Sequence, residues 1–385
     1  MASNTLTNIL DKILARNLML LRENAVMPRL VNIDFSEEAA RPGATIDIPI
    51  SKAQTVADVT PGPVHASAQA NTPGLVQVPM AQHRHTDFFL TDREMMEVDR
   101  NQHFVPGQME EAVKALANDI DDHIHSQYTG IYGFVGTAGT VPFSTVTTTT
   151  DARKTLNNQL APNDGRWRIV MDPDAEAQAL QLAAYADISV AGDRNVPING
   201  EIGRKLGFDH FMSQNVTTHT AGSIQATGLV VGSATAAGAS SVDLKSAGAT
   251  GNLLVGDIFT VAGDTQTYVV QATVSAIASG TAKAVTIDPP LTQIASANDA
   301  VTVKATHVVN LAFQRNAIAF VTRPLERSVA ADLRGGNAMQ SVVDPQTGLT
   351  LRLEVIRQNK QDSWDLDVLY GAKLVRPEFA ARIAG

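Results

Sequence analysis

Two histidines and a carboxylate lie close together in the first quarter of the chain, as His83, His85 and Asp87. Alternate residues of an extended strand point to the same face, so these three side chains would share one face. Imidazole and carboxylate groups are common zinc ligands, so the trio could hold a metal ion. No partner motif accompanies it, and a motif without its structural context is weak. We favour a solvated strand face over a metal site.

A second group of ionisable residues lies in a segment with helical periodicity. His123 and His125 are two residues apart, so they point to different faces of a helix, unlike the i, i+4 pair of a metalloprotease helix. Near a helix C-terminus, positively charged histidines are mildly favourable. Asp119, Asp121 and Asp122 could serve acid–base chemistry. On a long exposed helix we expect them to form a solvated face instead.

The other motifs of catalytic or nucleotide-binding proteins are not matched. Gly133, Gly136 and Gly139 lack the G-x-G-x-x-G and G-K-[ST] patterns of phosphate-binding loops. No G-x-S-x-G nucleophile elbow occurs. The chain has no cysteine, which excludes disulfides, thiolate catalysis and zinc sites built on sulfur. We therefore expect no catalytic, cofactor-binding or metal-binding residues, no cofactor and no enzyme activity.

The composition indicates a globular protein of two or three structural units. The chain has 385 residues, of which 44% are hydrophobic and 18% are charged. The net charge is -9 and Lys and Arg are scattered along the sequence, which argues against a basic surface for nucleic acid. The N-terminus lacks the pattern of a signal peptide, and no run of about 18 apolar residues predicts a membrane span.

The first hundred residues predict a helix followed by a long hairpin. Residues 4–23 have the periodicity of an amphipathic helix, and Pro28 ends it. This helix packs on its own domain or is an arm that docks on a neighbour, and periodicity alone favours the first. Residues 41–104 contain two alternating strands joined by a Pro/Gly-marked tip at 60–74. A long loop without its own core usually has an external role.

The rest of the chain predicts a long helix, an α/β domain and an inserted β domain. The helix runs from about 106 to 128, a length of about 30 Å. Helices and strands alternate over residues 151–184, as in an α/β domain. The last of these helices would have Asp172 at its N-cap and Pro173 at its first position, and would run to about residue 184. Residues 221–307 contain no Glu and no Arg, and their short strands predict a small all-β barrel or sandwich. Residues 349–355 and 363–370 alternate apolar and polar, which predicts an antiparallel, half-buried pair.

Several segments, in this order, resemble the tailed-bacteriophage major capsid (coat) proteins of the Hong Kong 97 fold, and most closely the P-twenty-two-type coat proteins. Residues 255–263 resemble the strand that opens the barrel of that branch, and residues 287–291 resemble its later turn. Residues 310–320 resemble the strand that returns from the barrel, and 369–371 with 376–378 resemble the closing strand and its stop. The resemblance covers essentially the whole chain. The insert is short, which leaves its role in contacts between subunits open.

The resemblance implies an α+β fold of seven segments. They are an N-terminal arm (1–40), an extended hairpin or E-loop with flanking strands (41–104), a spine helix (105–131), a first axial part (132–220), an inserted β-barrel (221–307), a second axial part (308–340) and peripheral strands (341–385).

The same resemblance implies a shell subunit as the function. Copies of the chain would form the hexamers and pentamers of an icosahedral head that encloses double-stranded DNA without sequence-specific binding. A scaffolding protein and a portal are the implied partners, a decoration protein is a further candidate, and no membrane is involved. The location would be the virion, after assembly in the host bacterial cytoplasm. The alternatives are an encapsulin-like nanocompartment shell, a surface adhesin with a β module, and a metal-dependent enzyme using His83, His85 and Asp87.

Overall fold

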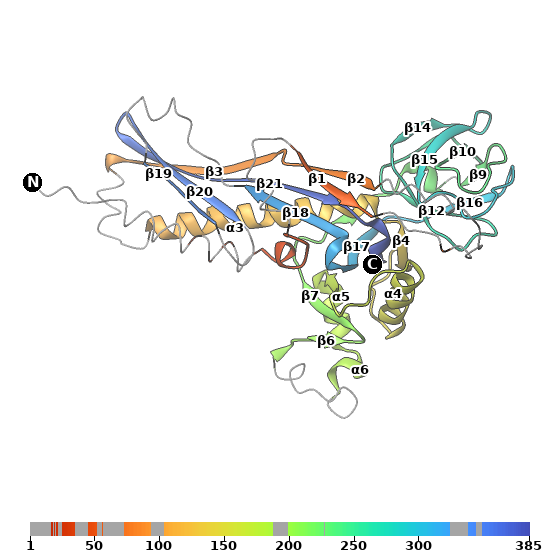
Figure 1. The fold of residues 1–385 in the computed structure, drawn as a ribbon, viewed down its shortest axis with the longest axis horizontal. Coiled ribbons are helices and arrows are strands. Elements are labelled where there is room, and N and C mark those ends of the chain that lie inside the picture. Colours follow the sequence, from red (N-terminus) through yellow and green to blue (C-terminus); the bar gives the residue numbers. More distant parts are fainter. Residues whose placement is uncertain are drawn as a thin grey trace, which may run out of the picture.

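The protein is elongated and has three parts in this computed structural model. The structure describes Asn17, Met19, Leu21 and Val56 and the residues 25–34, 45–51, 73–93, 104–187, 199–226, 228–323, 338–343 and 349–385. Figure 1 shows a long helix under an extended sheet at one end and a small barrel at the other, with an α/β part below them. We call the extended sheet the distal sheet, the sheet of the α/β part the central sheet, and everything outside the barrel the body.

The distal sheet packs on the longest helix. That helix, α3, spans Phe104–His125 and continues as the 3-10 turn η3, Ser126–Gly130. The strands of the sheet are β3 (Gln82–Thr91), β18 (Ile318–Arg323), β19 (Ala338–Val343), β20 (Thr350–Gln358) and β21 (Gln361–Leu374). β21 pairs antiparallel with β3, β20 and β18, which confirms the predicted pairing of the two C-terminal segments. Its alternation puts Trp364, Leu366 and Val368 into the core shared with α3.

Two N-terminal segments rest on this unit. Strands β1 (Thr45–Ile50) and β2 (Gly74–Pro79) form the predicted antiparallel pair, while most of the predicted tip lies outside the described residues. The predicted helix over residues 4–23 also lies almost entirely outside them. Residues 25–34, which we call the strap, contain the 3-10 turn η1 (Met27–Arg29) and contribute buried side chains to the core around α3.

The central sheet has the strand order β4-β22-β17-β5-β7-β6, with β8 paired to β17. The strands are β4 (Gly133–Gly136), β5 (Trp167–Met171), β6 (Arg204–Lys205), β7 (Phe208–Met212), β8 (Thr218–His219), β17 (His307–Gln314) and β22 (Ala380–Ala384). The helices of this part are α4 (Thr147–Asn158), α5 (Pro173–Leu180) and α6 (Ala183–Ala186). Short 3-10 turns, η5 (Arg315–Ala317) and η6 (Pro377–Phe379), complete the part.

Two local predictions in this part need correction. The single helix expected from 173 to about 184 is two helices, because Leu182 adopts an extended conformation between α5 and α6. Asp172 stands at the N-cap with Pro173 behind it, as predicted, but its side chain makes no capping hydrogen bond. The backbone N–H of Asp172 instead donates to Asn310 at 2.6 Å, which ties the start of α5 to the neighbouring strand β17.

The third part is a closed six-stranded barrel in the described residues. Of the two predicted forms, barrel and sandwich, the barrel is confirmed. Its strands are β9 (Leu229–Val231), β10 (Ser241–Ser246), β12 (Ile258–Val261), β13 (Tyr268–Val270), β15 (Lys283–Asp288) and β16 (Ala300–Val303). A side pair, β11 (Gly251–Leu253) with β14 (Val274–Ile277), and the turn η4 (Ser223–Ala226) complete it. Its interior is filled by an apolar cluster of its own. Among the described residues, no helix combines the length and apolar character needed to cross a membrane.

Candidate functional site

The first candidate from the sequence, on β3, lies on the face of the distal sheet opposite α3. His83, His85 and Asp87 are all exposed and share this face, as expected for a strand. Each histidine meets a carboxylate of β21: His83 Nε2 is 3.0 Å from Asp367 Oδ2, and His85 Nδ1 is 3.3 Å from Asp365 Oδ1. In the described part of the chain, no group of three or more His, Cys, Asp or Glu is arranged to hold a metal ion.

Charged residues cross this face from strand to strand, and we call it the distal charged face. Asp87 lies opposite Asp365, and Asp365 lies opposite Glu354 on β20, so three carboxylates form one cross-strand row. Like charges directly opposite one another are destabilising. Burial, together with Asp367 and Asp87, raises the pKa of Asp365, while His85 lowers it. Arg352 supplies cationic charge beside the row, with its Nε donating to Asp367 at 2.8 Å.

The aspartates of α3 do not all form a solvated face, so that prediction is wrong for Asp121. The strap covers this side of the helix, and Asp121 is only 1% exposed. Its carboxylate accepts the backbone N–H groups of Val26 at 3.1 Å and Met27 at 3.0 Å. Burial raises the pKa of Asp121 to about 6, and the two hydrogen bonds oppose that rise. Asp122 is exposed as predicted, whereas Asp119 accepts the hydroxyl hydrogen of a tyrosine in β21 at 2.5 Å.

The end of α3 also differs from the prediction of favourable positive histidines. His125 is buried, with Nε2 2.9 Å from the carbonyl oxygen of Val309 and Nδ1 3.1 Å from Thr217 Oγ1. Burial lowers the pKa of His125 to about 4, so the ring is neutral at pH 7. His123 is half-buried against Tyr370, and burial lowers its pKa as well. The two rings point to different surroundings, as their spacing predicted.

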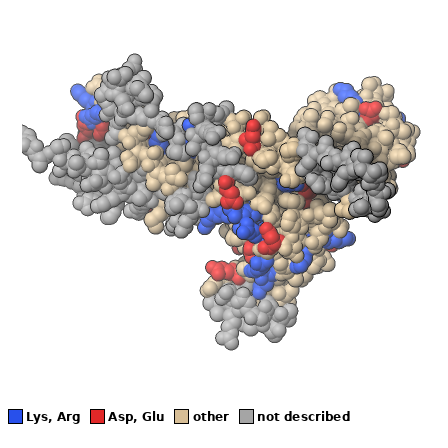
Figure 2. Space-filling view, viewed as in Figure 1, with Lys and Arg blue, Asp and Glu red and all other residues tan. Residues whose placement is uncertain are grey.

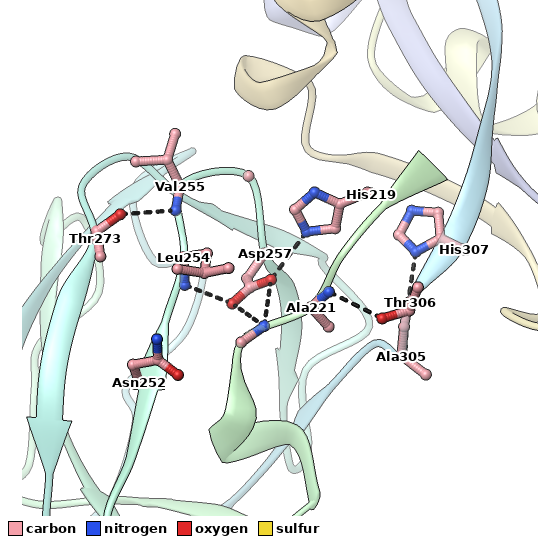
Figure 3. Close-up of polar contacts among 12 residues, drawn as sticks. His219, Ala221, Asn252, Leu254, Val255, Asp257, Thr273, Ala305, Thr306 and His307 are labelled. Atoms are coloured by element: carbon pink, nitrogen blue, oxygen red, sulfur yellow. Dashed lines mark hydrogen bonds and ion pairs between the residues drawn. The ribbon is translucent and has the colours of Figure 1, made fainter. Parts of the chain in front are cut away.

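His125 belongs to a buried polar cluster at the joint between barrel and body, which we call the junction. The chain leaves the body after β8 and returns through β17, and these two crossings pair with each other at His219 and His307. Figure 3 shows the two crossings side by side, with the N–H of Ala221 donating to Thr306 Oγ1 at 3.1 Å. The barrel is therefore attached by two hydrogen-bonded strands that run in opposite directions.

One carboxylate of the barrel ties these crossings to the barrel wall. Asp257, which is fully buried, accepts hydrogen bonds from His219 Nε2 at 2.9 Å, Gly222 N at 3.1 Å and Leu254 N at 2.7 Å (Figure 3). A Cβ on Gly222 would collide with the carbonyl oxygen of Asn252, so only glycine lets the backbone approach this closely.

A buried arginine of the body meets the same turn. Arg382 on β22 is 0% exposed and donates from Nη1 to the carbonyl oxygen of Gly256 at 2.7 Å. Its guanidinium lies 5.1 Å from the ring centroid of Tyr128, a favourable cation–π geometry. Its Nε and Nη2 have no hydrogen-bond partner among the described residues, and burial lowers the pKa of Arg382 to about 9. Gly256 has a φ of +90°, a conformation that favours glycine.

The third histidine of the junction has one free nitrogen. His307 Nδ1 is 2.7 Å from the carbonyl oxygen of Ala305, while its Nε2 has no partner among the described residues. Burial lowers the pKa of His307 to about 4, and the neighbouring Arg382 and His219 lower it further. The ring stands edge-on to Phe134 at 5.2 Å between centroids.

Apolar packing completes the contact between barrel and body. Tyr132 and the partly buried Phe134 of the body pack against Ile258 and Val269 of the barrel. The hydroxyl of Thr267 donates to the carbonyl oxygen of Tyr132 at 2.6 Å. Apolar and hydrogen-bonding contacts therefore join the barrel to the body at one interface.

The polar residues of the junction connect the barrel to the body. Tyr128 Oη lies 3.3 Å from His219 Nδ1, so tyrosine, histidine and Asp257 form a hydrogen-bonded series. Burial raises the pKa of Tyr128, so its hydroxyl keeps its proton and is not an activated nucleophile. Sequence reasoning missed this cluster because its members are spread along the chain from residue 125 to residue 382. The one available signal was the Gly256–Asp257 turn inside the segment that resembles the opening strand of the phage barrel.

The sequence matches no profile of a known protein family and no curated protein. Solved structures with a similar fold include a chain of Mycobacterium phage Che8, with a TM-score of 0.52 and 16% identity, over 93% of this chain and 90% of that chain. A chain of the capsid of the cyanophage P-SCSP1u has a TM-score of 0.49 and 13% identity, over 94% and 88% of the two chains. A chain of the virus-like particle from Pyrococcus furiosus has a TM-score of 0.44 and 8% identity, over 97% and 98%.

Of these three, the Che8 chain passes a TM-score of 0.5, and at such low identity the likeness bears on the fold alone. The protein thus has a mixed α+β architecture of the phage capsid type that includes a closed six-stranded barrel. This agrees with the fold class implied by the resemblance in the sequence.

Proposed function

We propose that the protein is the major capsid protein of a tailed bacteriophage, a shell subunit without catalytic activity. The observation that carries this proposal is the likeness of fold to the phage Che8 chain, because it extends over 93% of this protein and 90% of the other and so is not limited to one part of the molecule. The sequence gives independent support, because several of its segments resemble those of phage coat proteins and occur in the same order.

The shape of the chain suits a shell subunit. α3 and the distal sheet make a long thin unit, and the barrel lies at the opposite end of the molecule (Figure 1). Such a shape offers each copy several separate surfaces for its neighbours. Many weak contacts between identical subunits add up to a stable closed shell, because each contact raises the effective concentration for the next.

We assign the segments as the resemblance implies. Residues 1–40 would be the arm and 41–104 the E-loop with its flanking strands, of which the strap and β3 lie within this chain's own fold. Residues 105–131 would be the spine helix, and 221–307 the barrel inserted into the axial domain. The observed β8 and β17 crossings, which pair at the barrel's base, support an insertion with two adjacent connections.

The partners follow from the same assignment. Hexamers and pentamers of this chain would build the icosahedral head around double-stranded DNA, with a scaffolding protein and a portal as assembly partners. The net charge of -9 favours weak binding of the enclosed DNA, because DNA-binding surfaces are basic. Figure 2 supports this for the face it shows, where Lys and Arg lie beside Asp and Glu.

The direct test is negative-stain electron microscopy of the protein expressed alone and together with the neighbouring genes. We expect closed shells, or sheets of hexamers, in at least one of the two preparations. Dispersed monomers in both preparations would overturn the proposal. Shells filled with a co-expressed enzyme, in place of a portal vertex, would favour a nanocompartment shell.

A further inference from the structure

The hydrogen bonds of the junction assign one proton to each of its three histidines. His125 Nε2 and His307 Nδ1 each face a backbone carbonyl oxygen, which only accepts, so these nitrogens carry the proton. His219 Nε2 faces Asp257 at 2.9 Å, so it also donates, and its Nδ1 lies 3.3 Å from the hydroxyl oxygen of Tyr128. His125 and His219 thus have a partner at each ring nitrogen, whereas Nε2 of His307 has none among the described residues.

A second proton would have an unfavourable place on His307. It would sit on Nε2, a buried nitrogen with no acceptor among the described residues. On His125 it would sit on Nδ1, where the hydroxyl of Thr217 can turn to accept it, so His125 has no comparable penalty. An unpaired charge in a buried site is costly.

The charges that face these rings oppose protonation further. Arg382 of β22 faces both His125 and His307. His307 also faces His219 of β8 and Asp257 of the barrel, and Asp257 already accepts three hydrogen bonds. The ring of Phe134, which contacts His307, holds the ammonium of Lys304 at 5.4 Å on its face. Asp257 is thus a single carboxylate beside a buried guanidinium, and a protonated histidine would add a second positive charge.

We propose that the junction is a proton-operated latch, which holds the barrel at a fixed angle to the body while His307 is neutral and releases it when His307 takes up a proton. The ring of His307 contacts Phe134, which packs against Ile258 and Val269 of the barrel. The released barrel stays folded, because its apolar core is separate from the junction. It remains attached through the two crossings, where β8 pairs with β17. The latch is a property of the single chain and does not depend on its assembly into a shell.

The direction of the pH dependence follows from linkage. Burial lowers the pKa of His307 to about 4, and in the released state it would regain a value near 6.5. The released state therefore binds more protons between these values, and the latch weakens as the pH falls from about 6.5 toward 4. At pH 5 a fully exposed His307 would favour release by roughly 30-fold over its buried form.

The experiment uses the absence of cysteine from the chain. Spin labels are attached to Ala115→Cys, exposed on α3, and Thr281→Cys, exposed on the barrel. Electron–electron resonance then measures the distance between labels from pH 7.5 to pH 4.5, with circular dichroism recorded in parallel. We expect one narrow distance distribution at pH 7.5 and a broad or shifted one near pH 5, with the circular dichroism unchanged.

Two variants test whether His307 causes the pH-dependent change in the distance distribution. His307→Phe keeps a ring but takes up no proton, so its transition should move to lower pH. His85→Ala on the distal charged face is the matched control and should leave the transition in place. A distance distribution that stays constant down to pH 4.5 in the folded, otherwise unaltered protein would overturn the latch. So would a transition that coincides with loss of circular dichroism, or one that is the same in His307→Phe.

Discussion

Histidine–aspartate pairs occur at both ends of this molecule, and they stand in opposite surroundings. At the distal charged face, the side chains of His83 and Asp367 are 53% and 5% exposed. At the junction, those of His219 and Asp257 are 5% and 0% exposed. The N–O distances, 3.0 Å and 2.9 Å, hardly differ. The same pair of residue types therefore meets with the same geometry at one site where the histidine is exposed to water and at another where both side chains are buried.

The surroundings decide what each pair contributes. Exposed ion pairs gain little, because water and salt screen them and both side chains lose freedom. Breaking a buried pair by removing one partner costs several kcal/mol, because the group left behind is neither hydrated nor paired. The exposed residues of the distal charged face, His83, His85 and Asp87, can thus be changed at small cost to the fold, whereas the buried residues of the junction cannot. Substitutions at three residues, Asp257, Asp121 and Asp87, test this contrast, and they are given from the largest expected effect to the smallest.

Asp257→Ala should be the most damaging change. It leaves the N–H groups of Gly222 and Leu254 and the Nε2–H of His219 without their acceptor, in a site that excludes water. We expect a loss of about 3–5 kcal/mol, measured as a lower midpoint in urea unfolding followed by circular dichroism. Hydrogen exchange should locate the loss in the barrel and β8.

Asp257→Asn is the matched variant, because it keeps one acceptor oxygen without the charge. It should be clearly more stable than Asp257→Ala. Equal losses in the two variants, or a loss under 1 kcal/mol in Asp257→Ala, would mean that the buried junction behaves like an exposed surface.

Asp121→Ala should have an intermediate effect, because this buried carboxylate accepts two backbone N–H groups, whereas Asp257 accepts three hydrogen bonds. Val26 and Met27 would lose their acceptor at a cost of about 1–3 kcal/mol. Hydrogen exchange of a peptide spanning the strap should rise strongly, while that of the barrel stays unchanged. Barrel exchange that rises as well would show that the strap and the junction are not independent.

The pH dependence of Asp121 has the opposite sign to that of the junction histidines. Its folded pKa of about 6 lies above the usual pKa of 3.8 for an aspartate, so the folded state binds more protons between these values. Its contribution to stability is full below about pH 4 and is lost as the pH rises through 6. In Asp121→Asn this slope should vanish, which urea unfolding at pH 4, 5, 6 and 7 would show.

Local patterns in the sequence predicted the elements well and the buried polar sites poorly. The alternation of β20 and β21 and the apolar stripe of α3 depend on near neighbours, so they can be read from short segments. Asp121 meets its partners about 95 residues away, and Arg382 meets Gly256 126 residues away. A signal for Asp121 existed, because it lies four residues after the buried Ala117 and three before the buried Ile124. Asp257 and Arg382 carry no such periodic signal, because the fold alone brings them together.

The smallest effect should come from the row of carboxylates on the distal charged face, where the substitution should raise the stability of the protein. Asp87 lies opposite Asp365, which in turn lies opposite Glu354, so Asp87→Asn removes one of three neighbouring like charges. We expect a gain in stability of about 0.2–0.5 kcal/mol at low salt. The gain should shrink at 1 M salt, because screening weakens the repulsion that the change relieves. A gain that is insensitive to salt would mean that Asp87 acts through packing, and a loss would mean that its charge is paired with a cation. Either result would mean that the distal charged face differs less from the junction than its exposure indicates.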